Sequence, residues 1–160
     1  LSKTHDRRSF RCESEVLTKY LVQQARQDVQ RKLAACFVAT RGTPQVLGFY
    51  TLSTDSIPRS DVPAKMRKSL PKSYRAPVIL FGRLARDLTH RGQGLGELLL
   101  MDALLRCLWL SDESVGAMAI VVDPLDEGAA AFYARYGFIT LPDSGRMFLP
   151  MHTIRLLGQA

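Results

Sequence analysis

The pattern of apolar and polar positions in the first half of the chain predicts a helix, a hairpin and an interrupted segment. In residues 13–33, apolar side chains recur at roughly helical spacing with Gln, Arg and Lys between them, which indicates a helix in one or two pieces. Two short apolar runs, at 35–40 and 45–53, flank an Arg-Gly-Thr-Pro turn and predict a β-hairpin. Prolines interrupt residues 56–75, and one of them suits the first turn of a short helix over 63–70. The helical apolar positions of the first segment are Val16, Leu17, Tyr20, Leu21, Ala25, Val29 and Leu33.

The second half alternates between apolar runs of strand length and longer helical segments. Residues 76–87 predict a long strand, and residues 94–110 a helix that is apolar nearly all round and therefore expected to be largely buried. A buried strand at 117–122 precedes a helix at 126–136, which Gly137 ends. Two final strands follow, at 138–141 and 147–150. This order of elements predicts an α/β fold in one domain, 1–160, with a mixed sheet and helices on both faces.

Composition and charge narrow the class of protein. Hydrophobic residues make up 46% of the chain, and no apolar run reaches the ~18 residues of a membrane span, so a soluble globular protein is expected. The three cysteines, Cys12, Cys36 and Cys107, lie far apart and show no metal-ligand spacing, so neither a disulfide framework nor a metal site is expected, and Cys36 and Cys107 suit the core. The cysteine usage fits the reducing cytoplasm, where the protein is expected. The net charge of +7 favours an anionic partner, although a solvated basic surface explains it equally well.

The most informative segment connects the long strand at 76–87 with the helix that follows. Three glycines in five positions allow successive backbone N–H groups to line one concavity at the start of a helix, where the helix dipole is positive, and a pyrophosphate fits such a site. The segment lacks the Gly-Lys-Ser/Thr of a P-loop and the G-x-G-x-x-G of a dinucleotide fold. An ordinary glycine-rich turn is the alternative. The segment consists of Arg91, Gly92, Gln93, Gly94, Leu95 and Gly96.

The spacing Arg91-x-x-Gly94-x-Gly96 between a strand and a helix resembles the coenzyme A signature of the GNAT-type N-acetyltransferases. A second segment, with Phe132, Tyr133, Gly137 and Phe138 in the order F-Y-x-x-x-G-F, resembles the late helix of that family. The order of all the elements matches as well, so the resemblance covers nearly the whole chain. It implies a GNAT-like mixed central sheet that splays open after the long strand.

The family resemblance also implies the placement of acetyl-CoA, the expected co-substrate, and a catalytic role. The pantetheine arm is expected in the gap of the sheet, bound by backbone groups of Leu84 and Ala85, with Gly82 marking a bulge and Phe132 contributing from the late helix. Tyr133 occupies the position of the tyrosine that assists departure of the thiol, although a packing role is the alternative. No general base is evident. Asp87 ends the strand before the loop, Glu97 belongs to the pyrophosphate loop, and His90 is more typical of an exposed turn.

Further segments are similar to the toxin branch of bacterial toxin–antitoxin modules. They are His5–Cys12, Tyr20-Leu21 with Gln24-Ala25, Gly48–Ser53, Arg83-Leu84-Ala85 and Phe148–Met151, with Glu13 standing where the family often has glycine. The resemblance implies acetylation of the free α-amine of aminoacyl-tRNA, which stops translation. It also implies a small ribbon-helix-helix antitoxin as partner and contact with DNA only through that antitoxin. A homodimer is possible for this family, and the resemblance does not decide the oligomeric state.

A basic stretch over 56–75 is compatible with a tRNA substrate, since phosphates attract basic surfaces. A solvated loop is the alternative, and no RNA-binding module is recognisable. Two other functions remain open at this stage: an acetyltransferase of small-molecule or protein amines that is not a toxin, and a binding module that keeps the fold without turnover. The candidate tRNA contacts are Lys65, Arg67, Lys68 and Lys72.

Overall fold

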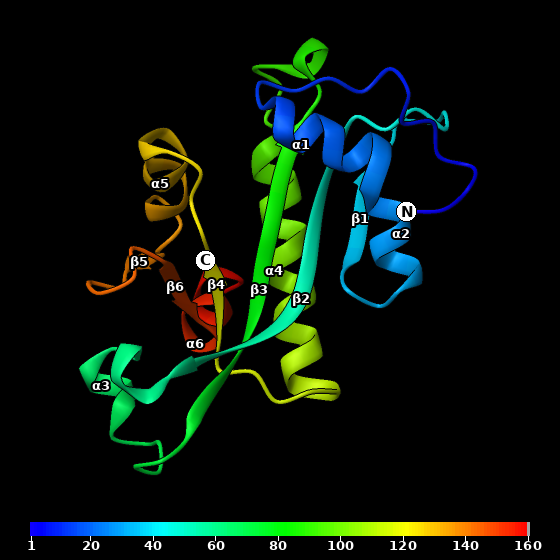
Figure 1. Cartoon of the computed structure of the whole chain (residues 1–160). Helices are drawn as coiled ribbons and strands as arrows, with labels where there is room; N and C mark the ends of the chain where they lie inside the picture. Colours follow the sequence, from blue (N-terminus) through cyan, green and yellow to red (C-terminus); the bar gives the residue numbers. More distant parts are fainter. Residues whose placement is uncertain (160) are drawn as a thin grey trace. The chain divides into compact units, whose positions relative to one another are not determined.

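The computed structural model describes residues 1–159 and has a mixed six-stranded sheet with the strand order β1-β2-β3-β4-β6-β5 (Figure 1). Ala160, the last residue of the predicted domain, lies outside the described residues. The strands are β1 (Ala35–Ala39), β2 (Gly48–Pro58), β3 (Arg75–Arg86), β4 (Ala119–Val122), β5 (Ile139–Thr140) and β6 (Met147–Pro150). The helices are α1 (Glu15–Lys19), α2 (Ala25–Gln30), α3 (Ala64–Arg67), α4 (Leu95–Glu113), α5 (Glu127–Ala134) and α6 (Met151–Leu157).

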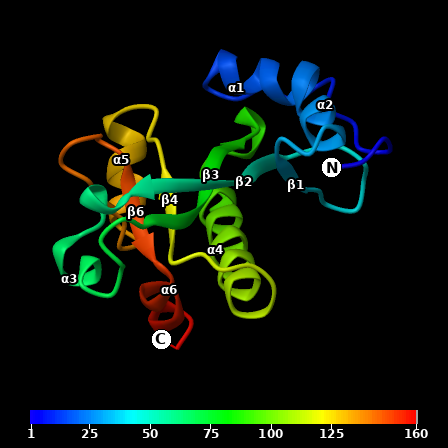
Figure 2. The same ribbon diagram turned by 60° about the horizontal axis from the view of Figure 1, so that its bottom comes forward.

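The first of two compact units contains residues 1–53 and 82–103. Successive residues of β2 point to opposite faces, as a strand requires. The Phe49 ring packs against the rings of Phe10 and Tyr20, with centroids 5.7 and 6.2 Å away, on the side of α1 and α2. The Tyr50 hydroxyl instead donates to Asp102 of α4. Figure 2 shows α1 and α2 on one face of these strands and the beginning of α4 on the other, as the sequence predicts.

The second unit contains residues 54–81 and those from 104 onward. Its sheet pairs β3 with β4 in parallel and β4 with β6 antiparallel, and Val78, Ala119, Val121 and Phe148 belong to its buried core. The pairing of β3 with β4 runs from Val78 to Phe81 and ends there. Beyond Phe81 the edge of β3 is therefore not paired with β4, as expected for a splayed sheet.

Packing within the first unit explains why position 82, just beyond the pairing with β4, is occupied by glycine. A Cβ atom at Gly82 would lie 2.8 Å from Oγ1 of Thr51 on β2, which is closer than real Cβ contacts. Any larger residue would therefore require the Thr51 side chain, or β2 with it, to shift at this point.

The predicted N-terminal helix is present but shorter and less regular than the apolar pattern indicates. It runs from 15 to 30, and its centre, Tyr20–Gln24, is a π-helical segment. The Leu21 carbonyl of this segment accepts a hydrogen bond from the Arg7 guanidinium at 2.8 Å. The predicted end of this helix at 33 is wrong, because the helix ends before Lys32, which has a positive φ of 62°, and Leu33 lies after it. Val16 does lie in α1, but its side chain, like that of Leu33, is exposed.

The expectation that the helix over 94–110, observed as α4, is largely buried is wrong in part. Leu99, Leu100, Ala103, Leu104 and Cys107 are buried, but other apolar side chains of α4 face solvent. A helix against one face of a sheet buries only one stripe, so a uniformly apolar sequence leaves some apolar residues outside. The exposed ones are Leu98, Leu105 and Trp109.

The last helix, α6, was not predicted from the sequence. It begins directly after Pro150, and it buries Met151 and Ile154, which are three residues apart. Its seven residues are too few for a strong periodic signal. Cys36 and Cys107 are both buried, as expected. Among residues 1–159, no helix combines the length and the apolar character that a membrane span requires.

Candidate active site

The glycine loop lies at the N-terminus of α4 and is open to solvent. Gly92 and Gly94 have φ angles of 74° and 73°, a conformation that side-chain-bearing residues rarely adopt. Gly96 differs, because it lies in the first turn of the helix without a positive φ, and a Cβ atom there would meet no atom within 4 Å. The fold therefore does not require glycine at position 96. The open backbone at the positive end of the 19-residue helix fits the approach of an anion.

The backbone of β3 beside the loop has one paired and one open edge. The Asp87 N–H donates to the Leu47 carbonyl at 2.7 Å, and the Ala85 carbonyl faces the backbone of Gly48. Since backbone groups alternate along a strand, Leu84 and Arg86 direct theirs to the opposite edge. An extended polar arm can add to that edge as a further strand would.

Asp87 holds the N-terminal segment against the start of the loop. Its carboxylate accepts from the Arg11 N–H at 3.0 Å and from the N–H and hydroxyl of Thr89 at 3.0 and 2.7 Å, and the Leu88 N–H donates to the Arg11 carbonyl at 2.8 Å. Burial acts to raise the pKa of Asp87, but the hydrogen bonds from Thr89 and Arg11 lower it by more, so the net pKa lies below the ordinary value. Asp87 is thus a structural anion rather than a general base.

The hydrogen bonds of Asp87 predict an acid-sensitive contribution to stability. Because the folded-state pKa lies below the ordinary value of 3.8, ionised Asp87 stabilises the fold above that pH, and this contribution is lost as the pH falls through the folded-state value. We expect Asp87→Ala to lower the free energy of unfolding by about 1–3 kcal/mol at neutral pH, measured in urea, and by less in acid. Asp143→Ala, at an exposed loop position, is the control. An equal loss for Asp87→Ala at pH 3 and pH 7 would contradict this account.

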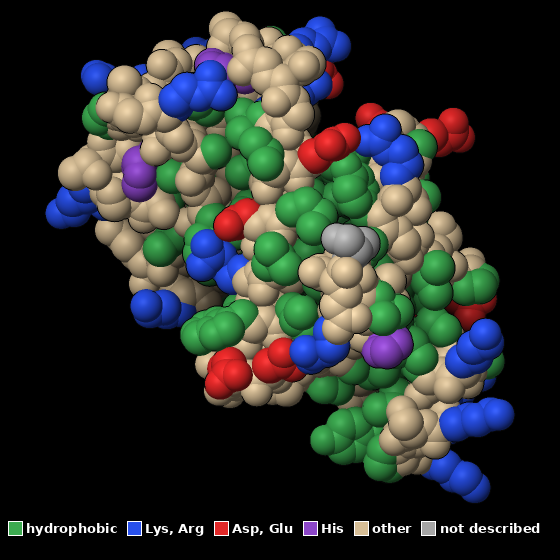
Figure 3. Space-filling model, turned by 180° about the vertical axis from the view of Figure 1, so that it is seen from behind, with side chains coloured by type: hydrophobic (Ala, Val, Ile, Leu, Met, Phe, Trp, Pro, Cys, Tyr) green, Lys and Arg blue, Asp and Glu red, His purple; other side chains and the backbone are tan. Residues whose placement is uncertain are grey.

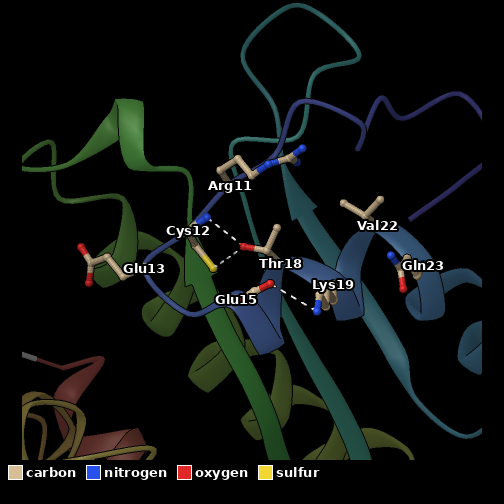
Figure 4. A pocket seen from close by; sticks show the side chains of 8 residues that line it. All are labelled: Arg11, Cys12, Glu13, Glu15, Thr18, Lys19, Val22 and Gln23. Carbon is tan, nitrogen blue, oxygen red and sulfur yellow. Dashed lines mark hydrogen bonds and ion pairs between the residues drawn. The ribbon is translucent and has the colours of Figure 1, made fainter.

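A cavity of about 470 Å³ opens between the N-terminal segment and the first helix. Its lining combines charged and neutral polar side chains. The Glu15 carboxylate pairs with Lys19 at 3.2 Å, and the Cys12 N–H donates to the Thr18 hydroxyl at 3.0 Å (Figure 4). Sequence reasoning did not single out this cavity, because its residues come together only when the segment before α1 folds across the helix. The lining residues are Arg11, Cys12, Glu13, Glu15, Thr18, Lys19, Val22 and Gln23.

In the second unit, Tyr133 is buried in an aromatic cluster on α5. Its ring contacts those of Phe81, Phe132 and Phe138, with centroids 6.1, 5.4 and 5.4 Å away. Burial raises the pKa of the Tyr133 hydroxyl above its ordinary value, so the hydroxyl stays protonated at neutral and mildly alkaline pH. Within residues 1–159 no partner accepts a hydrogen bond from it. The hydroxyl is therefore a protonated donor that a ligand atom can use.

The candidate tRNA-binding residues differ in how they are used by the fold. Lys65, Lys68 and Lys72 are exposed, and Figure 3 shows basic side chains projecting from the segment that contains α3. The Arg67 guanidinium instead donates to the carbonyls of Val62 and Ser60 at 3.0 and 3.2 Å, which shapes the loop. Tyr74, with 54% of its surface exposed, is an aromatic residue beside these cations that sequence reasoning missed. Its position directly before Arg75, within the basic stretch, was the signal by which the sequence could have indicated it.

Comparisons with known proteins extend over the full chain. The sequence is 36% identical to a tRNA-acetylating toxin of Mycobacterium tuberculosis (strain ATCC 25618 / H37Rv), covering all of this chain and 91% of the relative. The structure resembles AtaT complexed with acetyl-methionyl-tRNAfMet, with a TM-score of 0.90 and 31% identity over 98% of this chain and 94% of AtaT. It also resembles an AtaT mutant toxin bound to the C-terminus of the antitoxin AtaR and acetyl-CoA, with a TM-score of 0.82 and 28% identity over 98% and 92%. No protein-family model matches the chain.

Proposed function

Because this chain belongs to the family of tRNA-acetylating toxins, which have the GNAT-type acetyltransferase fold, we propose that it acetylates the free α-amine of aminoacyl-tRNA from acetyl-CoA and so blocks translation. The observation that carries the proposal is the open glycine loop at the start of α4, in a chain that matches a tRNA-acetylating toxin along its whole length. Because β2, β3 and α4 each contribute residues to both compact units, we treat the chain as a single catalytic domain.

In this proposal, acetyl-CoA binds through the loop and the open edge of β3. Backbone N–H groups of Gly92, Gly94 and Gly96, with Gln93 and Leu95 between them, hold the pyrophosphate, and Arg91 adds a fixed positive charge. The pantetheine arm lies along the open edge of β3, where Leu84 presents its backbone groups, whereas Ala85 directs its own toward β2. A backbone N–H there polarises the thioester carbonyl, a form of stabilisation worth several kcal/mol where water is excluded.

Tyr133 assists the departure of coenzyme A in this scheme. As the amine attacks the thioester carbon and the carbon–sulfur bond breaks, charge develops on sulfur, and the Tyr133 hydroxyl donates a hydrogen bond to it. Full proton transfer from tyrosine is uphill, because its ordinary pKa of ~10 exceeds the ~8.5 of a thiol and burial raises it further. The attacking α-amine needs no strong base, since α-amines titrate near pH ~8 and are partly neutral at physiological pH.

The exposed lysines around α3 are proposed to contact tRNA phosphates, with Tyr74 placed to stack on an unpaired base. Arg67 belongs to the same surface but mainly holds the loop in shape. The described residues hold no group of three His, Cys, Asp or Glu side chains suited to a metal ion, and the scheme uses none.

Replacing Lys65, Lys68 and Lys72 together by glutamine is expected to weaken tRNA binding and flatten its salt dependence. Each lost phosphate contact on a duplex region lowers the log–log salt slope by up to ~0.9. Filter binding across a salt series measures the slope, and acetyl-CoA affinity should not change. The matched control replaces Lys3, Lys19 and Lys32, which removes the same charge from the first unit. Equal slopes for the two triple variants would exclude a specific role for the α3 surface.

We also propose that the protein acts in the cytoplasm and that a ribbon-helix-helix antitoxin neutralises it, with DNA bound only through that antitoxin. Support comes from the structural similarity to AtaT in complex with the C-terminus of the antitoxin AtaR. The same similarity leaves a homodimer as an assembly to test by light scattering at several protein concentrations.

The experiment that tests the proposed function is mass spectrometry of charged tRNA after incubation with acetyl-CoA and the protein. N-acetylaminoacyl-tRNA is the expected product. Parallel reactions with polyamines and peptides identify a different acceptor class, and free thiol release in the absence of any acceptor reports hydrolysis alone. Acetylation of peptides without acetylation of charged tRNA would leave an acetyltransferase that is not a toxin, and no turnover of acetyl-CoA would leave a binding module.

A further inference from the structure

The Glu13 carboxylate forms ion pairs with Arg91 of the proposed acetyl-CoA loop and with Arg86 at the end of β3. Glu13 Oε1 lies 3.1 Å from Nε of Arg91 and 3.3 Å from Nη1 of Arg86. In Figure 4 the Glu13 side chain points away from the neighbouring Glu15–Lys19 pair. Glu13 therefore pairs with two arginines that lie 73 and 78 positions later in the chain. One is the last residue of β3, and the other is the first residue of the loop.

The position of Glu13 has a direct electrostatic consequence. Arg86 and Arg91 together supply two positive charges beside the glycine loop, and the Glu13 carboxylate cancels one of them. A pyrophosphate that pairs with Arg91 competes with this carboxylate for the same N–H donors and is repelled by its charge. The pair is reachable, since 55% of the Glu13 side chain and 64% of the Arg91 side chain are exposed.

We propose that Glu13 sets the affinity of the acetyl-CoA site. It pairs with Arg86 and Arg91 while the pyrophosphate position is empty, and Arg91 exchanges it for pyrophosphate when the donor binds. The inference rests on the proposed function, because it assumes that the loop binds the donor's pyrophosphate. The consequence of this pairing is a lower affinity for both acetyl-CoA and coenzyme A, and faster release of the product.

The test is isothermal titration of the full chain with acetyl-CoA. Glu13→Gln is expected to lower the Kd roughly two- to five-fold, a modest change because exposed ion pairs are weak and screened by salt. The gain should shrink as salt is raised from 0.05 to 0.5 M. Glu15→Gln is the matched control, since Glu15 lines the same cavity but pairs with Lys19 and should leave the Kd unchanged. An unchanged or higher Kd for Glu13→Gln would overturn the proposal, the higher value meaning that Glu13 orients Arg91 for the ligand.

Two further measurements separate a failure of this inference from a failure of the proposed site. In an Arg91→Ala background, Glu13→Gln should lose the part of its effect that comes from competition for Arg91, and only the weaker, salt-screened repulsion between Glu13 and the pyrophosphate should remain. S-acetylpantetheine, which lacks the pyrophosphate, should bind wild type and Glu13→Gln equally. If Arg91→Ala itself does not weaken acetyl-CoA binding, the loop is not the pyrophosphate site. The proposed binding of acetyl-CoA through this loop is then wrong. If Arg91→Ala weakens binding but Glu13→Gln has the same effect in both backgrounds, only the Glu13 inference fails.

Discussion

Tyr133→Phe is expected to lower kcat for acetylation of charged tRNA by about 10²–10³-fold, the range found when one hydrogen-bond donor to developing charge is removed. The substitution deletes one oxygen and keeps the ring in its contacts with Phe81, Phe132 and Phe138, so packing should survive. The loss should fall on turnover rather than on acetyl-CoA affinity, because the hydroxyl is used only as charge develops on sulfur. Steady-state kinetics and calorimetry measure the two quantities separately.

Tyr136→Phe is the matched control for this prediction, because it removes the same atom three residues later, just after α5, from a ring that also contacts Phe132. Its kcat should stay near that of wild type. Since burial keeps Tyr133 protonated, the rate of the wild-type enzyme should show no decline at mildly alkaline pH from this group. Expression of wild type should arrest bacterial growth, and expression of Tyr133→Phe should not. A variant that retains near wild-type kcat would remove Tyr133 from the mechanism.

Gly96→Ala is expected to separate cofactor binding from stability. Alanine at this helical position meets no atom of the protein within 4 Å and favours the helix, so the free energy of unfolding should rise by about 0.5–1 kcal/mol. The same methyl group occupies the space that a pyrophosphate needs and displaces it from the backbone N–H groups. Loss of one hydrogen bond to a charged group corresponds to roughly a 10- to 100-fold higher Kd for acetyl-CoA.

Gly116→Ala provides the control, because a Cβ atom there also meets nothing within 4 Å and the position is remote in sequence from the loop. Its Kd should not change. Gly94→Val should abolish donor binding as well, but its φ of 73° makes the loop itself strained, so Gly96→Ala gives the cleaner result. A Gly96→Ala protein that binds acetyl-CoA as tightly as wild type would place the pyrophosphate elsewhere.

The parts of the candidate site that the sequence alone could propose are those whose residues lie next to one another in the chain. The glycine loop was recognisable because its chemistry needs small residues at fixed spacing directly before a helix, and the structure has α4 beginning at Leu95. Tyr133 was recognisable from the segment around it. The role of Glu13 was not, because it depends on contacts with residues more than 70 positions away. Arg67 was predicted from its charge to contact tRNA, and only its hydrogen bonds to Val62 and Ser60 revealed its role in shaping the loop.

The sequence alone determined the α/β class, the order of the elements as far as β6 and the strand-to-helix glycine loop, since periodicity and turn residues act over short distances. The tertiary structure alone decided which apolar positions of α4 are buried, because a helix lies against the sheet on one side only. It also decided that β3 leaves β4 after Phe81, where Gly82 lets β2 and β3 approach closely. Most of all, it decided that the Glu13 carboxylate meets Arg86 at the end of β3 and Arg91 of the loop, because electrostatic interactions depend on distance in space and not on separation along the chain.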